Sequence, residues 1–207
     1  MLPRRQHSKQ SRKQRISMTP LTNTTKLTQN ESEALKTTAK KLWELRDLLH
    51  SCPLDENLDL LRLKTAVEQV QEIQGNLAND GSLIACVLAR QFLQRRFERP
   101  AFDAAAKPQG APGLDVDVLT SSSERIIGEI KTTVPYERNR RDLGANQKAT
   151  FIKDFEKLEE KEAQHKFFFV TNPFTHEVVS VRYGKRLRDR NIELVLLGGG
   201  EESLIES

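Results

Sequence analysis

Two neighbouring segments in the middle of the chain constrain the fold most, because apolar and charged residues alternate in both. Gly113–Leu119 reads Gly-Leu-Asp-Val-Asp-Val-Leu, and Arg125–Val134 contains Gly-Glu-Ile-Lys-Thr. Successive side chains of a β-strand point to opposite faces, so this period of two predicts a strand in each segment. The turn-rich stretch Thr120–Glu124 separates the two segments, and we therefore expect a β-hairpin.

The second half of the chain predicts further helices and strands. A long amphipathic helix is expected over Ala145–Gln164, because four apolar residues recur there at helical spacing. These residues are Phe151, Ile152, Phe155 and Leu158. The apolar runs in Lys166–Thr171 and Ile192–Leu197 each predict a buried strand. Between these strands we expect a helix around Tyr183–Arg190, with a short strand over Val178–Val181 as an alternative at its start.

The first 76 residues predict a basic tail followed by a helical extension. Residues 1–30 carry seven Arg and Lys and no Asp or Glu, so the rest of the chain has a net charge of −3 within a total of +4. Residues 1–29 are expected to be a mostly disordered tail that either contacts nucleic-acid phosphates or is solvated. Residues 30–76 predict two helices, one from near Asn30 to just before Pro53 and one over Asp55–Gln74.

Residues 77–198 are expected to form the folded core, and residues 199–207 a flexible acidic tail. Asn79–Gly81 predicts a turn, after which Ser82 is expected to cap a helix that ends near Phe97. The following stretch contains Pro, Gly and Ala and predicts a loop, with a short strand around Ala101–Phe102. Helices and strands in this order predict an α/β fold in which helices flank a central mixed sheet.

Composition excludes several classes of protein. No apolar run approaches the roughly 20 residues that span a bilayer, and the N-terminus lacks the apolar core of a signal peptide. The two cysteines, Cys52 and Cys86, lie far apart and form no Cys-x-x-Cys pair. A disulfide framework and a zinc–cysteine site are therefore not expected. We expect a protein of the cytoplasm without a membrane partner.

The hairpin is expected to gather acids and a lysine on one face. Asp115 and Asp117 share a face of the first strand, and Glu129 and Lys131 share a face of the second. Clustered carboxylates bind hard cations such as Mg²⁺, which acidify bound water, and a neighbouring ammonium stabilises charge on a phosphodiester. A second Glu-x-Lys copy, Glu159–Lys161, lies on the solvated side of the long helix. The alternative is an exposed hairpin face with cross-strand ion pairs.

These two segments, with a helix beginning near Gln147 and a strand at Phe167–Val170, resemble the PD-(D/E)XK nuclease superfamily, and most of all its type II restriction endonucleases. The resemblance covers about residues 82–197. It implies a restriction-endonuclease-like core of αβββαβ topology, to which the helical extension is added. It also implies an Mg²⁺-dependent deoxyribonuclease, with Mn²⁺ as a substitute, that cleaves double-stranded DNA.

The resemblance carries roles to individual residues. Glu129 matches the second metal-binding acid and Lys131 the motif lysine, while Asp115 and Asp117 both remain candidates for the first acid. Many members also carry a metal-binding Glu in the first core helix. The segment Ser82–Phe97 has none. Glu98 is the best substitute, ahead of Glu68 and Glu72.

Residues outside the acid cluster are candidates for contacts with DNA. Arg138, Arg140 and Arg141 lie in the loop after the motif lysine, where they could meet phosphates or base edges. Gln147 and Lys148 could reach the site from the start of the long helix. One site cuts one strand, so a homodimer is expected to cut both. The alternatives are a repair or junction-resolving nuclease of the same fold, or a non-catalytic nucleic-acid-binding protein that kept the fold.

Overall fold

The computed structural model describes residues 26–51, 60–75, 77–97, 102–105, 112–136 and 142–198. The chain forms five helices and four strands within these residues. In chain order they are α1 (Gln29–Ser51), α2 (Leu60–Gln74), α3 (Leu77–Arg96), β1 (Val116–Leu119), β2 (Arg125–Lys131), α4 (Ala145–Glu160), β3 (His165–Val170), α5 (Pro173–Asp189) and β4 (Ile192–Leu196). Residues 1–25 of the predicted basic tail, the predicted acidic tail and the predicted start of the second helix at Asp55 lie outside the described residues.

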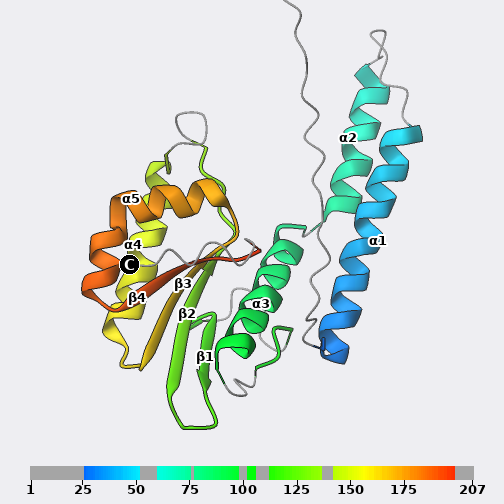
Figure 1. Ribbon diagram of the computed structural model, residues 1–207. Coiled ribbons are helices and arrows are strands. Elements are labelled where there is room, and N and C mark those ends of the chain that lie inside the picture. Colours follow the sequence, from blue (N-terminus) through cyan, green and yellow to red (C-terminus); the bar gives the residue numbers. More distant parts are fainter. Residues whose placement is uncertain are drawn as a thin grey trace, which may run out of the picture.

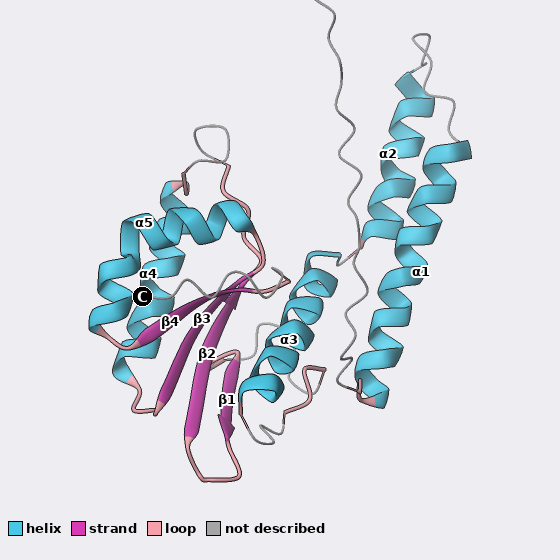
Figure 2. Ribbon diagram, in the orientation of Figure 1, coloured by secondary structure: helices cyan, strands magenta, loops and turns pink. Residues whose placement is uncertain are grey.

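The four strands form one mixed sheet in the order β1-β2-β3-β4. The hairpin β1–β2 is antiparallel, as its short turn predicts, whereas β2–β3 and β3–β4 are parallel and are connected through α4 and α5. Figure 2 shows α3 on one side of the sheet and α4 with α5 on the other. The predicted α/β class, with helices flanking a mixed sheet, is therefore confirmed.

Each face of the sheet has its own hydrophobic core. Ile126 and Ile130 of β2 pack with α3, while Ile127, between them in sequence, packs with α4 and α5. The apolar run of β3 divides in the same way, because Phe167 and Phe169 lie on the α3 side and Phe168 on the other. Odd-numbered residues of β2 therefore face α4 and α5, and this face also receives Glu129 and Lys131.

Gly128 lets β2 and β3 pack closely just before Glu129. A Cβ atom at this position would lie 3.0 Å from Cε2 of Phe169 and 3.3 Å from the backbone oxygen of Phe167. Any side chain would have to displace the Phe169 ring, which is fully buried. The glycine that precedes the motif acid is therefore explained by packing on the α3 side of the sheet.

Two helices begin earlier than the sequence predicts. α3 starts at Leu77, so Asn79–Gly81 lies inside a helix and the prediction of a turn there is wrong. α5 is continuous from Pro173, which excludes the alternative strand at Val178–Val181. The reason is a local cap: the side chain of Asn172 accepts hydrogen bonds from the backbone N–H groups of Phe174 and Thr175, and Pro173 suits the first helical turn.

Three of the four strands, β1, β2 and β4, are shorter than predicted. β1 begins only at Val116, which packs on the α3 side of the sheet. Leu114 precedes the strand and packs in the α4–α5 core, because the alternation of the strand does not extend to Leu114. In the described part of the chain two strands precede α4, whereas αβββαβ topology has three. Phe102 is not in a strand, and Ala101 lies outside the described residues. The finer topology therefore remains a prediction.

The helical extension is joined to the core by a buried polar cluster at the start of α1. The Glu31 carboxylate is fully buried and accepts hydrogen bonds from the backbone N–H groups of Thr28 and Ala104. It also forms an ion pair of 2.5 Å with Arg90 of α3. α1 then runs alongside α2, and Figure 1 shows this pair extending past the end of α3. Among the described helices, none is long and apolar enough to cross a membrane.

Candidate functional site

The register of the hairpin places Asp115 beside Glu129. Val116 pairs with Gly128, so the next position along the two strands sets Asp115 opposite Glu129. The Asp115 carboxylate accepts a hydrogen bond of 2.8 Å from the backbone N–H of Ile130. This bond fixes the first acid against the Glu-x-Lys segment, although Asp115 itself precedes the strand.

Glu129 is a buried acid in a negatively charged setting. Its side chain is almost fully buried, with 2% of the residue exposed. Burial, together with the negative charges of Asp115 and Asp154, raises the pKa of Glu129 from 4.5 to about 7, although Lys157 and Lys131 oppose the shift. The Glu129 carboxylate is thus poorly neutralised by the protein alone.

Helix α4 supplies two further charged residues to the site. Asp154 is buried, and its Oδ2 lies 2.7 Å from Nζ of Lys131. Nζ of Lys157 lies 2.9 Å from Oδ1 of Asp154 and 3.3 Å from Oε1 of Glu129. The hydrogen bond to Asp154 is the main cause of the raised pKa of Lys157. Asp154 therefore holds both lysines, and Lys157 bridges the helix to the strand.

Sequence reasoning did not single out Asp154 or Lys157, since it assigned the charged residues of this helix to its solvated face. A signal for Asp154 was nevertheless present. It lies three residues after Phe151 and four before Leu158, which places it on the apolar face of α4. A charged residue within an apolar stripe must find a partner when the helix packs, and here the partners are lysines.

The structure separates the two candidate first acids. Asp117 is on the same face as Asp115, as predicted, but it pairs with Ile127 in the hairpin register. Both of its carboxylate oxygens bind Arg125, at 2.9 Å from Nε and 2.8 Å from Nη2. This exposed cross-strand pair matches the alternative interpretation of the hairpin face, whereas Asp115 belongs to the cluster around Glu129.

The candidate DNA-binding residues fall into two groups. Arg138, Arg140, Arg141 and the candidate acid Glu98 lie outside the described residues. Gln147 caps α4: its Oε1 accepts from the backbone N–H of Gly144, and its Nε2 donates to the carbonyl of Val134.

Lys148 shares the carboxylate of Asp142 with Arg182 of α5. The described interactions thus give Gln147 a structural role, while Lys148 and Arg182 place positive charge at the loop that follows β2.

The acid pair is compatible with a magnesium ion. Among the described residues, no group of three or more His, Cys, Asp and Glu side chains is arranged to hold a metal ion. Mg²⁺, however, keeps several water ligands and commonly binds through one or two carboxylates together with substrate phosphates. Asp115 and Glu129 provide such a pair, and a cation there would neutralise the buried acid.

Fold and site together describe an α/β protein whose mixed sheet carries a buried acid–lysine cluster on its α4 side. No protein-family model, no curated protein and no solved structure matches the chain. The resemblance to PD-(D/E)XK nucleases therefore stays a prediction that rests on the residues of the hairpin.

Proposed function

We propose that the protein is a metal-dependent endonuclease that hydrolyses phosphodiester bonds of double-stranded DNA, and that it acts as a sequence-specific type II restriction enzyme. The observation that carries this proposal is the meeting of Asp115, Glu129 and Lys131 at one end of the hairpin. The second Glu-x-Lys copy, Glu159–Lys161, differs from Glu129–Lys131 because its glutamate is paired with an arginine. Glu159 is bound by Arg186 of α5, at 2.6 Å between Oε1 and Nε.

Each residue of the cluster has a role in this proposal. Asp115 and Glu129 hold Mg²⁺, with Mn²⁺ as a substitute. When bound, the ion supplies a Lewis acid that acidifies water and offsets negative charge on the phosphodiester. The Lys131 ammonium orients the attacking water and stabilises the charge that develops on the phosphorus oxygens. Asp154 holds the Lys131 ammonium in place through their 2.7 Å contact.

Binding of DNA requires local positive charge, because the chain after the basic tail is slightly acidic. Lys148 and Arg182 meet at Asp142. The candidates Arg138, Arg140 and Arg141 directly precede Asp142 in the sequence. Duplex cleavage needs one site for each strand, so we place the enzyme in a homodimer. The two sites would then act on strands related by the two-fold axis of the DNA.

A non-catalytic DNA-binding protein on the same fold is the second candidate. One observation favours it: the described helix α3 contains a single acid, Asp80, which is bound by Lys41 of α1 at 2.7 Å. α3 therefore offers no acid comparable to the further metal ligand of many PD-(D/E)XK nucleases.

Plasmid cleavage tests the proposal. Purified full-length protein with Mg²⁺ or Mn²⁺ should cut plasmid into discrete fragments, and Lys131→Ala should lower the cleavage rate by about 100-fold or more. Lys161→Ala, in the second Glu-x-Lys copy, is the matched control and should cleave like the parent protein. Nicking of branched DNA without discrete plasmid fragments would favour a junction-resolving nuclease. If linear, supercoiled and branched DNA all stay intact, the protein is not this enzyme.

A further inference from the structure

The α1–α2 hairpin exposes more large apolar side chains than any other part of the described chain. Leu60 is the most exposed large apolar residue of α2, at 82%, and Leu49 is the most exposed aliphatic residue of α1, at 58%. The exposed apolar residues of the hairpin are Leu42, Trp43, Leu49, Leu60, Leu61, Leu63 and Val67. A soluble monomer seldom gathers so many on one element, and such a patch marks an interaction surface.

Five of these side chains lie on the same side of the hairpin. In α1 the half-buried residues Leu45 and Leu48 mark the side that packs against α2. An α-helix turns by 100° per residue, so Leu42 and Leu49 lie about 80° clockwise from that side when the helix is seen from its N-terminus. In α2, Leu60, Leu63 and Val67 lie clockwise of its own half-buried residues by a similar angle.

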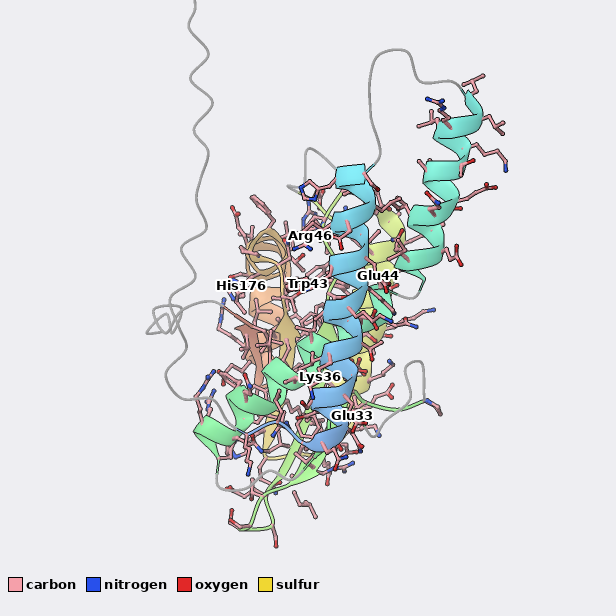
Figure 3. The ribbon with its side chains drawn as sticks, turned by 90° about the vertical axis from the view of Figure 1, so that its right-hand side faces the viewer. Glu33, Lys36, Trp43, Glu44, Arg46 and His176 are labelled. Carbon is pink, nitrogen blue, oxygen red and sulfur yellow. The ribbon has the colours of Figure 1, made fainter. Side chains whose placement is uncertain are left out.

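Two antiparallel helices present their clockwise sides to the same direction. We call the five residues Leu42, Leu49, Leu60, Leu63 and Val67 the hairpin patch. Figure 3 shows Trp43 and Arg46 on the side of α1 turned away from α2, and the Arg46 guanidinium lies 4.7 Å from the Trp43 ring centroid. Trp43 is therefore already covered in part by its neighbour and is not counted in the patch.

The size of the hairpin patch suits a protein partner. Side chains of this kind present on the order of 100 Å² each, so the five residues offer roughly 500 Å² of apolar surface. A typical interface is a little over half apolar and buries about 800 Å² on each partner. The hairpin patch with its polar border is therefore large enough for one half of a stable dimer.

The charges that border the hairpin patch favour a second copy over DNA. Arg46 lies at the outer edge of α1 and forms an ion pair of 2.7 Å with Asp47. The border on α2 carries the ion pair Lys64–Glu68, at 2.5 Å, and Glu72. DNA would need a uniformly basic border, whereas this border has both signs. Two copies related by a two-fold axis can set the mixed charges of one border against opposite charges of the other.

We propose that the hairpin patch is the contact through which a second copy of this chain docks, so that two α1–α2 hairpins form a four-helix interface. This assignment rests on the homodimer of the proposed function, but its test requires neither DNA nor metal.

Sedimentation velocity of the full chain is the direct experiment. The parent protein should sediment at twice the single-chain mass of 23.6 kDa at micromolar concentration. Val67→Glu, on the patch, should raise the dimer dissociation constant about tenfold or more, because the interface would bury an unpaired charge. Val181→Glu is the matched control, since Val181 of α5 is 81% exposed and lies outside the patch, and it should leave the dimer intact.

A second measurement uses the parent protein alone, so that a folding defect of the variant cannot decide the outcome. Amide hydrogen exchange in α1 and α2 should become faster on dilution from dimer to monomer, while exchange in β2 and β3 stays unchanged. The proposal is overturned if the parent chain is monomeric up to about 100 μM, which would assign the patch to another partner. It is equally overturned if the dimer survives Val67→Glu or if Val181→Glu also dissociates it. A dimer without nuclease activity would refute the proposed function and leave the proposed contact intact. A monomer that cleaves DNA would refute the contact and leave the proposed function intact.

Discussion

Replacement of Glu129 by Gln tests the electrostatics of the site most directly. The cluster holds three acids, Asp115, Glu129 and Asp154, and two bases, Lys131 and Lys157. When all five are ionised, one negative charge is unbalanced in a buried position. Gln keeps the shape of Glu129 but removes that charge, so we expect the metal-free protein to become more stable at neutral and alkaline pH.

The pKa of Glu129 gives the size and the sign of the effect. Below pH 4.5 the carboxyl is protonated in both folded and unfolded chains, so its titration does not affect stability. Between pH 4.5 and about 7 the unfolded chain ionises first, so the free energy of unfolding of the parent protein falls as pH rises. The difference between the pKa values of 4.5 and about 7 corresponds to about 3 kcal/mol by pH 8.

The contact between Glu129 and Lys157 is already included in this value, because Lys157 lowers the pKa of Glu129 and so opposes the effect of burial. Relative to the difference between the two proteins at pH 4, Glu129→Gln should therefore gain about 3 kcal/mol of unfolding free energy at pH 8.

Urea unfolding in the presence of EDTA, at pH 4 and pH 8, measures this gain. Glu162→Gln, at an exposed position, serves as the control and should behave like the parent protein at both pH values. Adding Mg²⁺ at 100 times its dissociation constant should stabilise the parent by about 2.7 kcal/mol and Glu129→Gln by much less. If the Gln variant is no more stable than the parent at pH 8, Glu129 does not carry a buried, unbalanced charge and the reasoning about the site is wrong.

Three further substitutions test the positioning of Lys131 by α4 and the buried ion pair that joins α1 to α3. Asp154→Asn should lower the rate of DNA cleavage by about 10- to 100-fold, because Lys131 loses the group that positions it; Asp117→Asn should stay near the parent rate, and equal losses in both would contradict the separation of the two hairpin acids. Glu31→Ala should destabilise the protein by about 3–5 kcal/mol in thermal or urea unfolding, because Arg90 is left as a buried, unpaired charge. A loss below about 1 kcal/mol, typical of exposed pairs, would show that Glu31 and Arg90 are solvated.

The sequence by itself determined the local order of the core. Alternation of apolar and charged residues around Asp115 and Glu129 predicted the hairpin and the face that its acids share, and the structure confirms both. The amphipathic helix and the buried strand after it were predicted for the same reason, since periodicity reports which side of an element is buried. Helix starts were less accurate, because a cap such as Asn172 competes with the hydrophobic pattern.

Only the tertiary structure decided which charged groups meet. The pattern around Asp115 and Asp117 is the same, yet one acid is bound by the backbone of Ile130 and the other by Arg125. Asp154 reaches Lys131 from a helix more than 20 residues away in sequence. Periodicity assigns a side chain to a face, but the neighbour it finds there depends on strand register and helix packing, which involve residues distant in the chain. The electrostatics of the candidate site are therefore a property of the fold, although the residues of its hairpin could be read from the sequence.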